Sequence, residues 1–395
     1  MEPFFLVPLL AVIAPVAARL IGPWLRVPVL VFELLLGILV GPALLGWLHP
    51  EPILQVFSQL GLALLFFIAG SEIHVASFRG KTGRNAILGW VLSLALGIGV
   101  GALVGSLSGA IIIGIALSST ALGTLLPILR DAGENGTPFG RAVGALGAVG
   151  EFGPLVAISI FLAGHDPGVS TVILGGFLVL AAAWVLLTLK LPHGAMHAAV
   201  SATLHTSSQF AIRVVFAILG GLLALTSLFD VDFLLGAFAA GLIWQLMMRD
   251  ASEESREAVE SKVEGIAFGL FVPIFFLYTG ITFDLTSLLD QPELLLFVPV
   301  VLVGMLVVRG LPSLLAAPPG SSVRDRFSLM LFGATGLPIV VAVTAIGVDQ
   351  QLITSAQAAV LVAGGMLSVL IFPLVAMAIR GDRVNRGDGI VDEMA

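Results

Sequence analysis

One acidic and one basic side chain lie deep within apolar stretches of this chain. Glu151 lies in GALGAVGEFGPLVAISIF (144–161), and Arg309 lies in VLVGMLVVRGLPSLLA (301–316). An ionisable residue in the apolar interior of a membrane is costly, and it is therefore a candidate functional site. A carboxylate there is neutralised by binding a proton or by binding Na⁺ or K⁺, but not by both at once. Glu151 is thus a candidate site at which a proton and a monovalent cation compete.

Small polar residues interrupt the middle of two other apolar stretches. Ser-Ser-Thr occupies 118–120 before Pro127, and Ala-Thr-Gly occupies 334–336 before Pro338. Such residues weaken a helix and free backbone carbonyl groups. Irregular backbone at membrane depth is tolerated only where it is buried in protein or lines a cavity. Interrupted helices of this kind supply the oxygen ligands for Na⁺ in many transporters.

The sequence therefore predicts one composite ion site. The proton and cation ligands that we expect are Glu151, Ser118, Ser119, Thr120 and Thr335, with Glu151 and Thr120 on the monovalent metal ion. Arg309 would stabilise the negative ends of helices beside them and pair with Glu151 when no ion is bound. Two plainer interpretations stay open. The small residues could serve close helix packing, and Glu151 and Arg309 could form a structural ion pair.

The composition indicates that membrane helices hold these residues. Of 395 residues, 58% are hydrophobic and 11% are charged, whereas a soluble domain is about 25% charged. The apolar residues form blocks of about 20, which suffice for a helix to cross a bilayer core of about 30 Å. The chain has no cysteine for a disulfide or a thiolate metal site. It also shows no catalytic triad and no nucleic-acid surface. We expect a polytopic membrane protein that is not an enzyme, uses no cofactor and binds no nucleic acid.

Thirteen membrane-spanning helices are predicted. They cover 4–21, 27–47, 53–73, 85–107, 109–130, 138–163, 169–189, 209–228, 231–249, 263–283, 293–316, 326–347 and 356–379. The basic residues between the spans and those after the last one, Arg380 among them, all fall on one side, which marks the cytoplasmic side. We predict a cell-membrane protein with its N-terminus outside and its C-terminus in the cytoplasm. Glu33, Glu72 and Glu264 lie nearer span ends, where we expect water or a loop to reach them.

Two pairs of segments indicate an inverted repeat. LFFIAGSEIHVASF (65–78) is similar to FFLYTGITFDLTSL (275–288), and the interrupted segment at 116–127 is similar to that at 332–341. The paired spans are seven apart, an odd number, so the two copies cross the membrane in opposite directions. This inverted-topology architecture is typical of many secondary transporters.

Several of these segments resemble the monovalent cation:proton antiporter superfamily, on its Kef-type side. They are VFELLLGILVGPALLG (31–46), LGLALLFFIAGSEI (60–73), ALSSTALGTLLPILRDAG (116–133), FLLGAFAAGLIW (233–244) and FVPIFFLYTGITFDL (271–285). The resemblance covers nearly all spans, and its specificity comes from the order and spacing of the segments. It implies the sodium/proton antiporter fold, with two crossing discontinuous helices and an elevator-like transport movement.

The same resemblance implies a homodimer and a division of each chain. A scaffold or dimer subdomain would comprise 1–80 and 192–290, and an ion-translocating core 84–165 and 292–380. Residues 169–190 would link the two, and 381–395 would form a short cytoplasmic tail. The ion-binding acid of the superfamily would fall on Glu151, and its basic partner on Arg309. Members often carry a polar residue before that acid, where this chain has Gly150. A single carboxylate is more in keeping with electroneutral exchange.

The function that we predict is exchange of Na⁺ or K⁺ for H⁺. A sodium-coupled symporter of organic anions on the same fold, with Arg309 facing the substrate, is the main alternative. A channel or a membrane-embedded sensor is the other. A symporter would take up its substrate with sodium and without proton counterflow. His193, His197 and His205 precede the eighth span and could sense pH, although a solvated interfacial segment explains them as well.

Overall fold

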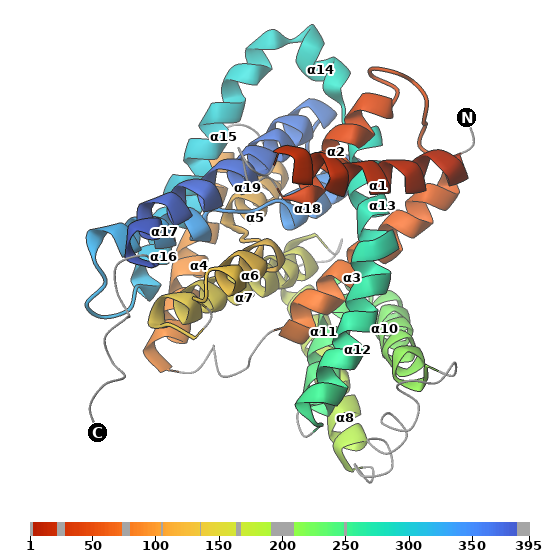
Figure 1. Cartoon of the computed structure of the whole chain (residues 1–395), viewed down its shortest axis with the longest axis vertical. Coiled ribbons are helices and arrows are strands. Elements are labelled where there is room, and N and C mark those ends of the chain that lie inside the picture. The colour runs from red at the N-terminus through yellow and green to blue at the C-terminus, as the bar shows by residue number, and fades with distance from the viewer. Residues whose placement is uncertain are drawn as a thin grey trace. The chain divides into compact units, whose positions relative to one another are not determined.

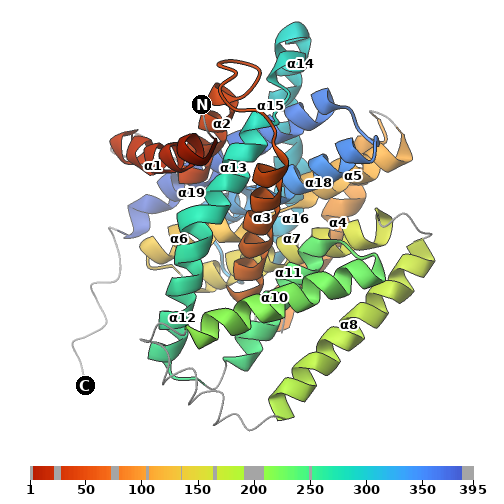
Figure 2. The same cartoon turned by 90° about the vertical axis from the view of Figure 1, so that its right-hand side faces the viewer.

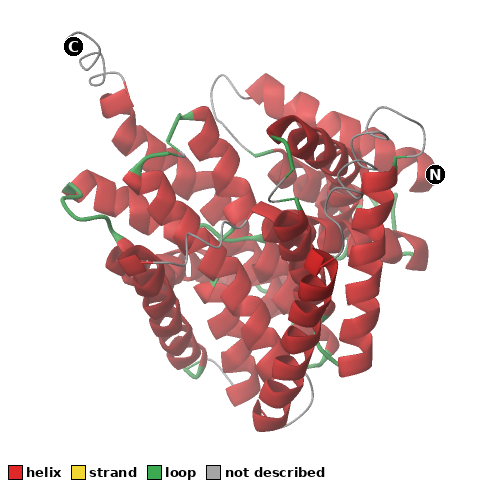
Figure 3. Cartoon of the chain, turned by 90° about the horizontal axis from the view of Figure 1, so that it is seen from below, coloured by secondary structure: helices red, strands yellow, loops and turns green. Residues whose placement is uncertain are grey.

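A computed structural model describes residues 3–21, 28–72, 80–103, 106–134, 136–162, 167–190, 209–248 and 251–384. Within these ranges every regular element is a helix (Figure 3). Nine of the described segments are long and apolar enough to cross a membrane, and four shorter apolar helices accompany them. Each of the thirteen predicted spans corresponds to one of these segments. The all-helical membrane fold is therefore confirmed. The stretch 192–208, with its three histidines, lies outside the described residues.

The described chain divides into two compact units, which we treat separately. The first comprises 1–19, 32–73 and 155–282. Its helices are α1 (Pro3–Ile21), α2 (Val29–Val40), α3 (Pro52–Glu72), α8 (Pro167–Lys190), α10 (Phe210–Phe229), α11 (Phe233–Met247), α12 (Glu253–Ile266) and α13 (Val272–Ile281), with the π-helical turn η2 (Ala267–Phe271) between the last two. Some helices begin or end slightly beyond these boundaries.

Glycines bring helices of the first unit close together. Helix α3 packs against α11 and α13 (Figure 1 and Figure 2). A Cβ on Gly70 or Gly241 would collide with backbone atoms of the facing helix, at Phe238 and Phe67 respectively. Small residues at such crossings let two backbones approach, which is the usual way in which membrane helices associate.

The second unit comprises 20–31, 74–154 and 283–395. Its helices are α4 (Gly80–Gly101), α5 (Leu107–Ser118), α6 (Leu122–Asp131), α7 (Pro138–Phe161, which continues into the first unit), α14 (Leu285–Asp290), η3 (Pro292–Leu296), α15 (Phe297–Met305), η4 (Leu306–Gly310), α16 (Leu311–Ser313), η5 (Leu314–Ala316), α17 (Val323–Gly333), α18 (Pro338–Asp349) and α19 (Ser355–Val384). All the residues predicted to form the ion site lie in this unit.

Two spans of the second unit are interrupted, as the sequence predicts. One is α5 followed by α6, and the other is α17 followed by α18 (Figure 1). Ser119 ends α5 because its hydroxyl donates to the carbonyl of Ala116 at 2.8 Å, in competition with the helical backbone pattern. Pro338 begins α18, where the missing N–H of proline costs nothing. Local sequence thus accounts for both interruptions.

A π-helical turn carries Arg309. The turn η4 (Leu306–Gly310) ends where the N–H of Leu311 donates to the carbonyl of Leu306, five residues back. Pro312 follows and has no N–H to donate to Val308, so the regular ladder is interrupted at this point. Single π turns of this kind are frequent at functional sites. The turn η2 stands before Pro273 in the same way.

Candidate functional site

The two interruptions bind one another through backbone groups. The N–H of Ala121 donates to the carbonyl of Thr335 at 2.8 Å, and the hydroxyl of Thr120 donates to the carbonyl of Gly333 at 2.6 Å. A helix leaves its first N–H groups and its last carbonyl groups without partners. Here the start of α6 and the end of α17 satisfy each other. The two discontinuous spans therefore cross at residues 119–121 and 333–336.

Helix α7 supplies a further backbone partner to the first interruption. The N–H of Thr120 donates to the carbonyl of Gly150 at 3.0 Å. In a regular helix this carbonyl would accept the N–H of residue 154, but Pro154 has none. The proline four residues on thus frees the carbonyl that Thr120 uses.

The absence of a side chain at Gly150 is a steric requirement. A Cβ at this position would lie 2.5 Å from the Cβ of Thr120 and 2.9 Å from Nη2 of Arg309. Atoms of other residues therefore fill the place where sequence analysis noted a missing polar ligand. No carboxylate fits there while Thr120 and Arg309 keep their positions.

Arg309 is fully buried, with 0% of its surface exposed. Its Nε donates to the hydroxyl oxygen of Thr120 at 2.8 Å, and its Nη2 donates to the carbonyl of Leu146 at 2.8 Å. Nη1 has no hydrogen-bond partner in the described part of the chain. The arginine thus donates to the Thr120 side chain and to the backbone of α7. The buried cation is therefore joined to the crossing itself.

Glu151 is 5% exposed on α7, directly after Gly150. Its Oε1 accepts a hydrogen bond from the N–H of Gly123 at 3.3 Å. Gly123 is the second residue of α6, so the carboxylate lies at the N-terminus of a helix. The N-terminal N–H groups and the helix dipole favour negative charge at such a place.

The other predicted ligands are buried at the same crossing. The hydroxyls of Ser118 and Ser119 donate to the carbonyls of Ile115 and Ala116, and that of Thr335 donates to Leu331. All three side chains are 0–1% exposed. A hydroxyl oxygen that donates its proton keeps two lone pairs for other contacts. Thr120 differs, because Arg309 uses one of its two lone pairs.

A further residue at the crossing, Ser368 on α19, is not predicted from the sequence. The N–H of Gly336 donates to its Oγ at 3.1 Å, and this hydroxyl also lies 2.7 Å from the carbonyl of Gly365. A Cβ on Gly365 would lie 3.0 Å from the carbonyl oxygen of Gly336. Ser368 thus accepts a backbone N–H of the second interruption, as the carbonyl of Gly150 accepts one of the first. The small residues of AGGMLS (363–368) are the signal that could have indicated this contact.

A further carboxylate, Glu33 on α2, is 5% exposed. Of the water or loop expected to reach it near a span end, water has little access. The helix α2 begins at Val29 and ends at Val40, so Glu33 lies within its second turn and is covered by protein.

The fold and the site together define a class of protein. A polytopic membrane protein with two crossing interrupted helices, a buried carboxylate and a buried arginine has the architecture of a secondary transporter. Residues 9–378 match the family described as "Sodium/hydrogen exchanger, transmembrane". The chain belongs to this family.

Known proteins similar to the chain agree with that assignment. It is 23% identical over 371 residues to the putative Na(+)/H(+) antiporter YjbQ of Bacillus subtilis (strain 168), covering 89% of this chain and 58% of YjbQ. It is 30% identical over 281 residues to the Na(+)/H(+)-K(+) antiporter GerN of Bacillus cereus, covering 65% of this chain and 66% of GerN. It is 24% identical over 367 residues to an Na(+)/H(+) antiporter of Enterococcus hirae, covering 88% of this chain and 91% of that protein.

A solved structure shares the fold. The sodium proton antiporter MjNhaP1 from Methanocaldococcus jannaschii, at pH 8, superposes with a TM-score of 0.68 and covers 96% of each chain, at 15% sequence identity. This likeness confirms the sodium/proton antiporter fold that the sequence predicts.

Proposed function

We propose that the protein exchanges Na⁺ or K⁺ for H⁺, with Glu151 as the shared binding group. The observation that carries the proposal is the position of this carboxylate. It is 5% exposed, and it binds the N-terminus of α6 beside the crossing of two interrupted spans. Two similar proteins support the choice of ions, since YjbQ is named as a Na(+)/H(+) antiporter and GerN as a Na(+)/H(+)-K(+) antiporter.

The chemistry follows from the cost of a buried charge. With neither ligand bound, the Glu151 carboxylate is a negative charge that the α6 N-terminus only partly offsets. A proton on one carboxylate oxygen removes that charge, and a Na⁺ or K⁺ ion at the same oxygen balances it. Because the two occupants compete for one group, each blocks the other. Movement that requires a neutralised site therefore couples cation flow in one direction to proton flow in the other.

The cation needs further oxygen ligands. Ser118, Ser119 and Thr335 have hydroxyl oxygens with lone pairs available for an ion, and Thr120 retains one. Carbonyl groups at the interruptions would complete the set. Thr120 would bind the ion through its remaining lone pair while its hydroxyl oxygen still accepts from Nε of Arg309.

Electroneutral exchange follows from the single carboxylate. A second acidic group beside Glu151 would bind a second proton and give unequal exchange. The space for its side chain is filled by Thr120 and by Nη2 of Arg309. Arg309 would keep its positive charge in both states, because the Thr120 hydroxyl and the Leu146 carbonyl accept hydrogen bonds from its guanidinium. One cation would then replace one proton.

The movement and assembly that we propose are those implied by the superfamily. The core, 84–165 and 292–380, would move against the scaffold, 1–80 and 192–290, with 169–190 as the linker. Two chains would associate as a homodimer in the cell membrane, with the C-terminus in the cytoplasm. The cytoplasmic placement rests on the basic residues between spans.

Ion flux in proteoliposomes tests the function. The purified protein is reconstituted with a pH-sensitive dye inside, and Na⁺, K⁺ or Li⁺ is added outside with and without a membrane potential. We expect proton efflux on cation addition whose rate does not change with the potential. Cation addition without proton movement would refute the proposal, and uptake of an organic anion with sodium would point to symport.

A further inference from the structure

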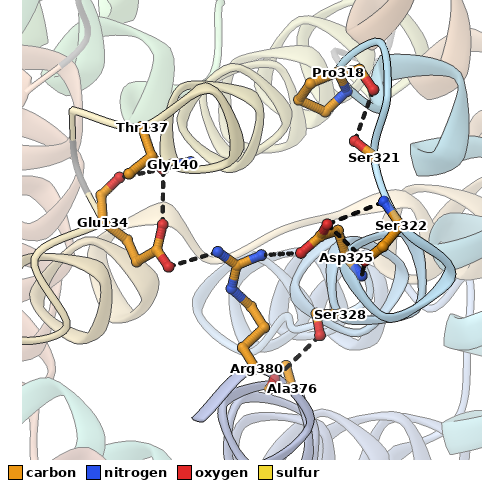
Figure 4. A network of polar contacts seen from close by, with 10 residues as sticks. All are labelled: Glu134, Thr137, Gly140, Pro318, Ser321, Ser322, Asp325, Ser328, Ala376 and Arg380. Carbon is orange, nitrogen blue, oxygen red and sulfur yellow. Dashed lines mark hydrogen bonds and ion pairs between the residues drawn. The ribbon is translucent and has the colours of Figure 1, made fainter. Parts of the chain in front are cut away.

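A buried arginine at the end of α19 binds two acidic residues from distant parts of the second unit. Nη1 of Arg380 lies 2.7 Å from Oδ1 of Asp325, and Nη2 lies 2.5 Å from Oε1 of Glu134 (Figure 4). The guanidinium carbon also lies 3.6 Å from the centre of the Phe139 ring. Arg380 is 9% exposed and Glu134 is 8% exposed. We call these four residues the Arg380 cluster.

Glu134 joins the cluster to the elements that hold Glu151. It lies in the turn between α6 and α7, three residues after α6 ends. The hydroxyl of Thr137 is 2.7 Å from the second carboxylate oxygen of Glu134, and Thr137 accepts from the N–H of Gly140 in the first turn of α7 (Figure 4). The Glu134 carboxylate is therefore fixed to the turn between α6 and α7. The N-terminus of α6 binds Glu151, and α7 carries Glu151.

Asp325 joins the cluster to the other interrupted span. It is the third residue of α17, and it forms a capping box with Ser322 at the start of that helix. Its Oδ2 accepts from the N–H of Ser322 at 3.0 Å and from the Ser322 hydroxyl at 2.7 Å (Figure 4). Helix α17 ends at Gly333, whose carbonyl binds Thr120 in the crossing.

Phe139, the aromatic member of the cluster, contacts both Arg380 and α17. Phe139 is the second residue of α7, and its ring packs edge-on against that of Phe332, near the end of α17, with centroids 6.0 Å apart. A guanidinium over an aromatic face is attracted by the ring, more strongly where water is excluded. Arg380 thus contacts the starts of α7 and α17 and the turn after α6 at once.

We propose that Arg380 is a positioning residue for the exchange reaction. It fixes the C-terminal end of α6 and the N-terminal end of α17 relative to α7. The opposite ends of these two half-helices then meet Glu151 and Thr120 in the geometry that binds the cation. The planar guanidinium suits this role because it donates to two carboxylates in a fixed fork and stacks on Phe139 at the same time. The proposal rests on the proposed function and deepens it.

The test compares apparent cation affinity in matched variants. Arg380→Met removes the charge and both ion pairs, and Glu134→Gln removes one pair while leaving Asp325 bound. Arg256→Met is the control, since Arg256 lies on α12, outside the cluster, at 3.8 Å from Glu260, and its side chain is about one-third exposed. Cation-driven proton flux is measured against cation concentration in proteoliposomes, with equal amounts of folded protein selected by size-exclusion chromatography.

We expect Arg380→Met to raise the KM for the cation roughly tenfold, because small displacements of binding groups weaken a site strongly. Glu134→Gln should raise it less, and the double variant should be no worse than Arg380→Met alone, since both act through one contact. Arg256→Met should leave KM unchanged. Arg380→Lys, which keeps the charge but not the fork, should restore part of the affinity.

Three results would overturn the inference. The first is a wild-type KM in folded Arg380→Met protein, which would mean that the cluster serves stability alone. The second is additivity in the double variant. If Arg380→Met does not fold, an unchanged KM in Glu134→Gln is the third. Wild-type protein without any cation-driven proton flux would instead remove the proposed function, and this inference with it.

Discussion

Replacing Thr120 with valine removes a hydroxyl that joins three parts of the crossing. The hydroxyl donates to the carbonyl of Gly333 at 2.6 Å and accepts from Nε of Arg309 at 2.8 Å. Thr120 is 1% exposed, and valine has almost the same shape. The substitution therefore leaves the packing in place and deprives one carbonyl and one charged donor of their partner.

The loss of stability in Thr120→Val shows whether Thr120 makes two ordinary interhelical hydrogen bonds or holds a buried charge. Hydrogen bonds between membrane helices average about 0.6 kcal/mol, so the loss of two ordinary bonds would cost about 1.2 kcal/mol. A buried acceptor without a donor costs about 1–3 kcal/mol, and a hydrogen bond to a charged group is worth about 1.5–3 kcal/mol. Because Arg309 is charged and wholly buried, we expect a total of about 3 kcal/mol or more. That is a change of about 150-fold in the unfolding equilibrium constant.

Reversible unfolding in mixed detergent and dodecyl sulfate micelles measures this difference. Thr120→Ser keeps the hydroxyl and should lose only about 1 kcal/mol for the buried methyl group. Thr344→Val is the matched control. Thr344 is 2% exposed, but among the described residues its hydroxyl bonds only to the Val340 and Val341 carbonyls of its own helix. Its loss should cost less than about 1 kcal/mol.

The reasoning fails if Thr120→Val and Thr344→Val lose the same small amount of stability. It fails also if Thr120→Ser is as unstable as Thr120→Val, since the methyl group rather than the hydroxyl would then account for the loss.

Two further predictions concern α7 and the start of α11. Gly150→Ala should abolish cation-driven proton flux and lower the melting temperature, because its Cβ would meet Thr120 at 2.5 Å. Gly144→Ala on the same helix should stabilise the protein by about 0.5–1 kcal/mol, because no described residue beyond the neighbouring turns of that helix comes within 4 Å of the new Cβ. Equal melting curves for the two variants would count against the steric argument. Burial raises the pKa of Asp232, in the loop before α11, to about 6, although the N–H of Leu234 lowers it. The raised value means that Asp232 contributes most stability below its unfolded pKa of about 4, and that this contribution is lost as the pH rises through 6. Melting temperatures of Asp232→Asn should lack that loss, and identical pH profiles for the variant and the wild type would contradict it.

Much of the fold can be predicted from the sequence because its signals are local. Runs of about 20 apolar residues mark the spans, and the clusters at 118–120 and 334–336 mark the two interruptions. These depend on neighbouring residues only: a serine that bonds to its own helix, or a proline that begins one.

The contacts of the site could be predicted only in part, because they join residues far apart in the sequence. Ser368 carries no charge, and the small residues of AGGMLS (363–368) indicate a close helix contact without identifying Gly336 as the partner. The freed carbonyl of Gly150 depends on Pro154, and its use depends on a backbone N–H from another span. In the sequence, Arg380 is one of the basic residues that mark the cytoplasmic side. Its burial against Glu134 and Asp325 follows from three elements that meet only in the folded protein.

The central claim is that one carboxylate, that of Glu151, binds either a proton or a cation. Proton release on cation binding tests it most directly. The purified protein is titrated with NaCl or KCl in weakly buffered detergent solution over a range of pH, and the released protons are counted per chain. The wild type should release up to one proton per chain, Glu151→Asp should retain release with altered cation affinity, and Glu151→Gln should release none. Release from Glu151→Gln equal to that of the wild type would contradict the account.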